Sequence, residues 1–264
     1  MAERAKRLLI VSQVYPPDPT AVGQHLEDAA SEMAARGWDV RVLTANRGYD
    51  DPSVRYTPRE ERAGARVRRL PLSSLGKRTI LHRLAGQLSF CGQVVLRTLL
   101  GRRPDHILVS TSPPMAGLIA VVANALRGVP FTYWVMDINP DQAVALGKVR
   151  PGSLPVRLFE GLNRTILKRA RSMVVLDRFM EETMVRKLPA ARDKAAVIAP
   201  WPLEGSLEDV GRAGNPFRKE HGLEDKFVIM HSGNHSLVHP LDTVLEAARA
   251  LRGDARLAFV FVGG

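Results

Sequence analysis

Cysteine is almost absent from this sequence, which contains only Cys91 among its 264 residues. A single cysteine cannot form an internal disulfide or build a cysteine-rich zinc site, and such a composition is typical of a reducing cytoplasm. Tyrosine and tryptophan are also few, at four and three residues, and no helix-turn-helix, RNP or zinc-finger signature is present. A nucleic-acid-binding function is therefore disfavoured.

Long uninterrupted apolar runs are also missing. Residues 107–126 carry no charge over 20 positions, but Pro113 and Pro114 divide them. We interpret the first half as a buried parallel strand and the second as a buried helix, instead of a membrane span. The N-terminus has basic residues followed by a short apolar run but no small-residue cleavage site, so we interpret it as a first strand and not as a signal peptide.

Positive charge is concentrated in one segment. Residues 55–104 contain twelve Arg or Lys and two Glu, a formal charge of +10 out of +11 for the whole chain. Such a patch suits an anionic surface, either nucleic acid or the phospholipid face of a membrane. A solvated face that only keeps the protein soluble is the alternative.

Short apolar runs alternate with helical patterns along the chain, which predicts an α/β fold with a doubly wound parallel sheet. The predicted strands cover 7–14, 39–45, 65–72, 106–112, 130–137, 172–177 and 194–200. The predicted helices cover 22–36, 77–101, 115–127, 154–170 and 178–187. We expect residues 1–201 to form one Rossmann-like domain, 202–225 to form a linker, and 226–264 to form the first βαβ unit of a second, incomplete domain.

Ligands of open parallel sheets bind at the carboxyl ends of the strands, where loops lead into helix N-termini. Gly23 is expected in such a loop, where it would let the backbone approach a ligand, although a tight turn explains it equally well. Gly233 and Asn234 follow a strand of the second unit in the same way. No G-x-G-x-x-G fingerprint is present, which argues against a nicotinamide enzyme.

Several polar residues are candidates for the cleft. Asp137 is expected at the end of an apolar strand, as either a cap or a group directed at a ligand, and Asn139 follows it in a turn. His25 could bind a ligand or cover the first turn of its helix. His231, His235 and His239 recur every fourth residue, but Gly233 and Pro240 make a helix unlikely there, so we expect no metal site.

The predicted helix 77–101 is amphipathic, with apolar residues three or four apart. It could pack on its own sheet, or it could lie on a bilayer with its apolar side in lipid and its arginines at the phosphates. The candidate membrane-surface residues are Arg78, Arg83, Arg97, Arg102 and Arg103.

Six segments together resemble the nucleotide-sugar-dependent retaining glycosyltransferases of family 4, which have the GT-B fold, and in particular the group that builds capsular, O-antigen or colanic-acid-type polysaccharides. These segments are VYPPDPTAVGQHLEDAASEMAARGWDVRVLTA, FTYWVMDINPDQAVALGKV, VVLDRFM, VIAPWPL, NPFRKEHGL and FVIMHSGNHSLVHPLDTVLEAA. The resemblance implies two facing Rossmann-like domains, a nucleotide-sugar donor, a lipid-linked glycan acceptor, no metal or other cofactor, and a cytoplasmic, peripheral location on the inner membrane face. It implies that Gly23 lies near the donor diphosphate, that Asp137 is the catalytic position and that Gly233 opens the donor loop.

The sequence departs from the family pattern in two places. Asn234 and His239 or Pro240 stand near the positions where many relatives have Arg and Lys. The acidic E-x7-E motif of the family would lie beyond Gly264, so we expect these 264 residues alone to bind donor poorly and to transfer little sugar. The alternatives are a GT-B nucleotide-sugar epimerase, which would need no lipid, and a non-catalytic half of a split transferase.

Overall fold

The computed structural model describes residues 4–49, 51–73, 80–202, 211–233, 235 and 240–263. The chain divides into two compact units. The first comprises Met1–Val144 and Val149–Trp201, and the second comprises Ala145–Lys148 and Pro202–Gly264. Each unit has its own sheet, so each is described separately.

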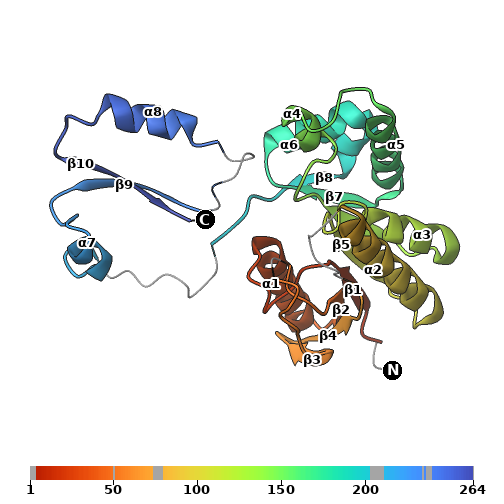
Figure 1. Ribbon diagram of the computed structural model, residues 1–264. Coiled ribbons are helices and arrows are strands. Elements are labelled where there is room, and N and C mark those ends of the chain that lie inside the picture. Colours follow the sequence, from red (N-terminus) through yellow and green to blue (C-terminus); the bar gives the residue numbers. More distant parts are fainter. Residues whose placement is uncertain are drawn as a thin grey trace. The chain divides into compact units, whose positions relative to one another are not determined.

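The first unit is built on an eight-stranded sheet with the order β3-β4-β2-β1-β5-β6-β7-β8 (Figure 1). Every neighbouring pair is parallel except β3 and β4, which form an antiparallel pair at one edge. This arrangement confirms the predicted α/β fold with a parallel sheet. The strands are β1 Arg7–Val11, β2 Asp39–Ala45, β3 Arg59–Arg62, β4 Ala65–Leu70, β5 His106–Ser110, β6 Phe131–Trp134, β7 Ser172–Val175 and β8 Ala195–Val197.

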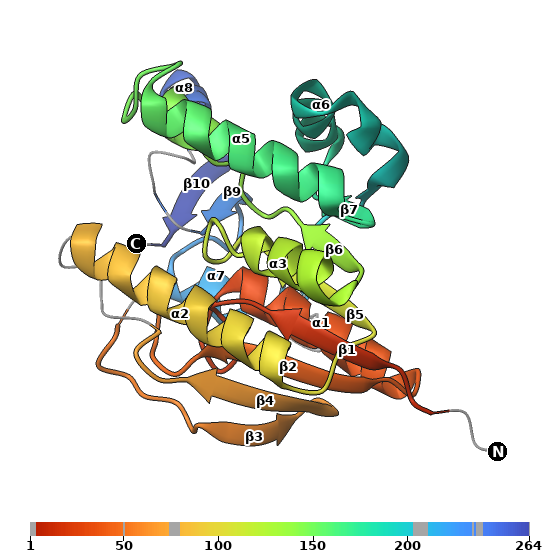
Figure 2. The same ribbon diagram turned by 90° about the vertical axis from the view of Figure 1, so that its right-hand side faces the viewer.

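Helices cover both faces of this sheet (Figures 1 and 2). Because successive side chains of a strand point to opposite faces, Leu8 and Ile10 of β1 pack on the α1 side, whereas Leu9 and Val11 join the core under α2 and α3. The helices are α1 Ala21–Ala35, α2 Ile80–Leu100, α3 Gly117–Arg127, α4 Asp141–Ala145, α5 Leu154–Arg169 and α6 Arg178–Lys187, followed by a 3-10 helix at Pro189–Lys194.

Helix α2 buries a different stripe from the one that its leucines suggest. Phe90 and Val94 are fully buried against the sheet. Leu81, Leu84 and Leu88 are 76%, 48% and 63% exposed. The helix is therefore packed on its domain and also presents an apolar stripe on its outer side.

The second unit contains a two-stranded parallel sheet of β9 (Phe227–Ser232) and β10 (Leu257–Val262), with helix α8 (Asp242–Ala250) between them in the chain. Helix α7 (Pro216–Glu220) lies in the segment predicted as a linker. Arg218 follows the Asn215 cap of this helix and donates to the carbonyls of Leu223 and Lys226 at 2.8 and 3.1 Å. No residue of β9, α8 or β10 is buried among those that the structure describes.

Candidate functional site

The loops that follow β1, β5 and β6 are joined by hydrogen bonds at the carboxyl edge of the first sheet. The N–H of Gln13 donates to the carbonyl of Ser112 at 2.7 Å. Thr111 Oγ1 accepts from the N–H groups of Met136 and Asp137 at 3.1 and 3.2 Å. Three loops that are far apart in the sequence thus form one surface, where ligands of open parallel sheets bind.

Gly23 lies in the first turn of α1, not in the loop before it. Helix α1 begins at Ala21, with Thr20 as its N-cap, and the Gly23 N–H donates to Thr20 Oγ1 at 3.3 Å. A Cβ on Gly23 would lie 2.9 Å from that oxygen and 3.1 Å from the Cα of Tyr15. Close packing between the helix and the preceding loop therefore accounts for glycine here, and this turn stands at the carboxyl edge.

His25 lies two residues further along α1 and is buried, with 8% exposure. Its ring contacts Trp201 edge to face at a centroid distance of 4.5 Å, and Trp201 Nε1 donates to Asp28 at 2.7 Å. Trp134 lies 6.0 Å from Trp201. Among the described residues, His25 Nδ1 and Trp134 Nε1 are buried without a hydrogen-bond partner. His25 therefore belongs to an aromatic cluster that holds the end of the first unit against α1.

Asp137 lies three residues beyond the end of β6, so the predicted strand 130–137 is too long. The chain bends at Asp137, whose side chain is exposed and whose N–H is held by Thr111. Burial raises the pKa of the Tyr133 hydroxyl, and the nearby Asp137 carboxylate raises it further. Asp137 therefore lies at the carboxyl edge of the sheet, and the charge of its carboxylate acts on the buried Tyr133 hydroxyl.

Asn139 lines a pocket of about 310 Å³, here called the apolar pocket. The carbonyl of Asn139 accepts a hydrogen bond of 2.5 Å from Asn163 of α5, and this bond fixes the loop. Apart from Asn139, Arg83 and Gln87, the lining is apolar or carries only a thiol. It consists of Leu84, Leu88, Cys91, Pro113, Pro114, Met115, Pro140, Ala143, Val149, Pro155, Val156 and Phe159.

The predicted membrane-surface arginines occupy different places. Arg83 lines the apolar pocket, whereas Arg97 and Arg102 line a second cavity on the face of the sheet. Arg103 donates to the carbonyls of Arg127 and Gly128 at 2.8 Å each, so its guanidinium caps the C-terminus of α3. Arg78 lies outside the described residues. No helix in the described part of the chain is long and apolar enough to span a bilayer.

In the second unit, Gly233 directly follows β9, and its N–H donates to the carbonyl of Val262 at 2.9 Å. Asn234 and His239 lie outside the described residues. The rings of His231 and His235 are 5.7 Å apart. The described residues contain no group of three or more His, Cys, Asp or Glu side chains that could hold a metal ion.

The sequence model of the glycosyl transferase 4-like domain family matches residues 20–201, which is more than half of the chain. The chain belongs to this family. One curated relative is WbjE of Pseudomonas aeruginosa, which is named as a glycosyltransferase. It is 24% identical to this family 4 chain, and the match covers 97% of this chain and 62% of WbjE. WcaI of Escherichia coli K12, named as a colanic acid biosynthesis glycosyl transferase, is 26% identical over 97% of the chain and 65% of its own length. The family 4 chain therefore spans less than two thirds of these two relatives.

Solved structures share the fold at low sequence identity. The Anabaena HepE protein in complex with UDP-glucose matches with a TM-score of 0.52 and 15% identity. The match covers 97% of the family 4 chain and 69% of the HepE chain. The α,α-trehalose-phosphate synthase of Burkholderia vietnamiensis has a TM-score of 0.62 and 15% identity, covering 99% and 64%. These neighbours are GT-B glycosyltransferases, which confirms the GT-B type of fold for this family 4 chain.

Sequence reasoning missed the residues that hold the loops of this family 4 site in place. Arg69 has a fully buried side chain, which donates to the carbonyl of Pro16 at 2.6 Å and to Glu60 at 2.7 Å. Gln13 and Thr111 tie the strand-end loops together. In the sequence Arg69 is one of many arginines, and only the alternation in β4 could have indicated an inward position.

Proposed function

We propose that the whole protein is a retaining glycosyltransferase that moves a sugar from a nucleotide-sugar to a lipid-linked glycan acceptor in cell-surface polysaccharide synthesis. Membership of the glycosyl transferase 4-like family is the observation that carries this proposal. The naming of WcaI for colanic acid biosynthesis supports the class of product, and the UDP-glucose bound to HepE supports the class of donor.

In this proposal, residues 1–201 form the acceptor side, 202–225 connect the domains, and 226–264 begin the donor side. Gly233 and Asn234 contact the donor, and the positive end of the α1 dipole, in the turn that contains Gly23, faces the departing phosphate. The bond between the donor C1 and the phosphate oxygen breaks, and the nucleoside diphosphate leaves with the bonding electrons. The acceptor oxygen forms the new bond to C1 on the same face of the sugar, and the hydroxyl proton passes to the departing phosphate. Asp137, His25 and Asn139 surround the reacting groups at the carboxyl edge, and no metal ion is required.

The apolar pocket supports a lipid-linked acceptor. It is bordered by Asn139 and Pro113, on the loops that follow β6 and β5, and among the described residues Arg83 is the only charged one in its lining. A lipid tail in this pocket would place its diphosphate near Arg83 and its first sugars near Asp137. The exposed leucines of α2 support a peripheral position on the inner face of the membrane.

A transfer assay tests this function. The whole protein is incubated with labelled UDP-, GDP- or dTDP-sugars and a polyprenyl-diphosphate-linked sugar, and labelled lipid product is measured. Asp137→Ala should lower transfer by about 100-fold or more, the usual scale for loss of a positioned acid-base or electrostatic group. Asp193→Ala removes another exposed carboxylate, from the 3-10 helix, and should have little effect.

Two results would contradict the proposal. If no donor gives transfer or hydrolysis with any lipid-linked acceptor, the assignment as a transferase fails. If an isomerised nucleotide-sugar forms without acceptor, the protein is an epimerase of the same fold. If the Asp137→Ala variant transfers sugar at an unchanged rate, Asp137 has only a structural role in the loop.

A further inference from the structure

A cavity of about 960 Å³ lies between the sheet and the last turns of α2, away from the carboxyl-edge loops. Seven arginines and two glutamates line it, and we call it the arginine cavity. Its walls come from β1, β2, β3, β4 and the segment from Leu96 to Pro104. The strand residues that line it include Arg7 and Leu8 at the start of β1, so it faces the amino-terminal half of the parallel strands.

Strand register places like charges directly opposite each other in this cavity. Arg41 of β2 is paired with Arg66 of β4, and Arg68 of β4 is paired with Arg59 of β3. Directly opposed like charges destabilise a sheet, and a nearby anion relieves this repulsion.

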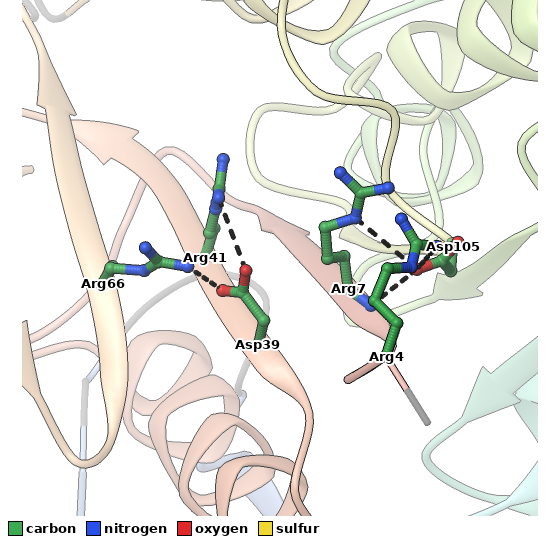
Figure 3. A network of polar contacts seen from close by, with 6 residues as sticks. All are labelled: Arg4, Arg7, Asp39, Arg41, Arg66 and Asp105. Atoms are coloured by element: carbon green, nitrogen blue, oxygen red, sulfur yellow. Dashed lines mark hydrogen bonds and ion pairs between the residues drawn. The ribbon is translucent and has the colours of Figure 1, made fainter. Parts of the chain in front are cut away.

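The first pair has that anion within the protein (Figure 3). Asp39 accepts from Arg41 at 3.4 Å and also binds Arg66. On the neighbouring strand, Nε of Arg7 lies 3.7 Å from Asp105 Oδ2, and the same carboxylate oxygen accepts from the backbone N–H of Arg7 at 2.8 Å. The N–H of Arg7 and the guanidinium of Arg4 hold the pKa of Asp105 below its usual value.

The second pair has no such anion in the described part of the chain. No carboxylate there lies within 4 Å of a guanidinium nitrogen of Arg59, Arg68 or Arg102. Glu61 lines the same cavity, but strand register places it opposite Arg66. Burial and the charge of Arg68 both lower the pKa of Arg97, which means that its charged form is poorly compensated. Within the described residues, the Nε atoms of Arg7, Arg41 and Arg97 and the hydroxyl of Thr98 are buried and lack hydrogen-bond partners.

The wall on the α2 side is apolar. Leu96 and Leu100 line the arginine cavity and are 55% and 79% exposed. They continue the row of exposed leucines on α2. Arginines next to exposed leucines match a surface that carries phosphates above hydrocarbon, whereas a small dissolved anion would gain nothing from the leucines.

We propose that the arginine cavity binds the phosphate-bearing headgroups of anionic phospholipids, with Leu96 and Leu100 entering the acyl layer beside them. This proposal rests on the membrane-surface part of the proposed function and gives that surface a specific lipid site. Arg59, Arg68, Arg97 and Arg102 supply the charge, and Asp39 and Asp105 hold the remaining arginines in place.

Vesicle binding tests this site without donor or acceptor, so the result does not depend on whether the protein transfers sugar. Binding of the full chain is measured to phosphatidylcholine vesicles with and without phosphatidylglycerol. Arg59→Gln with Arg68→Gln removes two unpaired, opposed charges, so the variant should fold with unchanged or higher thermal stability. Its affinity for the anionic vesicles should fall about 30-fold, since each basic residue at such a surface adds roughly tenfold or less.

The matched control is Arg164→Gln with Arg169→Gln, which removes the same charge from the exposed side of α5 and should change the affinity less than about threefold. Equal binding to neutral and anionic vesicles, or equal losses in the two double variants, would overturn the proposal. A third result would also overturn it. If the Arg59 and Arg68 substitutions abolish binding of inorganic phosphate but leave vesicle binding unchanged, the site binds a dissolved anion and not a lipid headgroup.

Discussion

At the scale of single residues, close packing against the preceding loop accounts for the glycine at position 23. The Cβ of Gly23→Ala would lie within 3.1 Å of Thr20 Oγ1 and of the Tyr15 backbone. We expect a loss of about 1–3 kcal/mol in the free energy of unfolding, measured by urea denaturation, because the loop must shift to admit the methyl group.

The matched control is Gly161→Ala, in the middle of α5, where a Cβ would meet no atom within 4 Å. Alanine is a better helix former than glycine, so this change should be neutral or should raise stability by up to about 1 kcal/mol. If Gly23→Ala behaves in the same way, the close approach described here is wrong, and the case for a ligand at that turn becomes stronger.

Cys91 is a natural probe of the apolar pocket, which it lines. Burial raises the pKa of its thiol to about 11, so little thiolate is present near neutral pH. At pH 8 we expect iodoacetamide to alkylate it on the order of 100-fold more slowly than a free thiol, and the rate should rise with pH up to the raised pKa.

The same reaction reports occupancy of the pocket. A polyprenyl phosphate that enters the apolar pocket should slow alkylation of Cys91 further, and inorganic phosphate should not. Protection of equal size by both would show that the lipid tail is not what covers the thiol.

At the scale of elements, α2 has two apolar stripes with different roles. Phe90 and Val94 face the core, whereas Leu81, Leu84 and Leu88 face outward. Phe90→Ala should lower the free energy of unfolding by about 3–5 kcal/mol, the usual cost of emptying a core site. Leu88→Ala should cost less than about 1 kcal/mol, because most of that side chain is already in solvent.

Vesicle binding should show the reverse order. Leu88→Glu places a charge on the outer stripe and should weaken binding to vesicles, while its circular dichroism spectrum stays unchanged. If Leu88→Ala instead destabilises the fold as much as Phe90→Ala, the stripe at 81, 84 and 88 is part of the core.

The order of elements in the first unit was predictable, because short apolar runs between turn residues indicate strands without knowledge of the tertiary contacts. The residues beyond the strand ends were not. Val14 and Val135 are apolar and buried, yet they lie in loops, so hydrophobicity alone extended the predicted β1 and β6. Strand β3 was missed because its sequence, REER, is wholly charged, as an exposed edge strand allows.

The elements that carry the candidate residues were predictable from the sequence, whereas their contacts were not. Gly23 and His25 lie on α1, and Asp137 and Asn139 lie in the loop that follows β6, as strand-end patterns indicate; that these residues form a site stays a prediction. The contacts that position them come from Thr111, Gln13 and Arg69, which carry no local signature. The outward stripe of α2 was equally hidden, since its sequence contains apolar residues on both sides and periodicity does not say which side meets the sheet.

At the scale of the whole molecule, the two units differ in how much core they contain. The first unit buries β1 and β5 between helices on both faces, and Ile10, Val11 and Val109 are fully buried. The second unit has two strands and a helix without a buried residue among them in the described part of the chain. A two-stranded sheet is marginal by itself, so the two units should differ widely in local stability.

Native-state hydrogen exchange of the 264-residue chain measures this difference. The amides of β9 and β10 should exchange at least about 100-fold faster than those of β1 and β5, because they open without unfolding the large core. A thermal melt should accordingly show loss of β9 and β10 before the main transition. Equal protection of β9 and β1 would contradict this expectation, and it would mean that the second unit gains its stability from contacts outside its own residues.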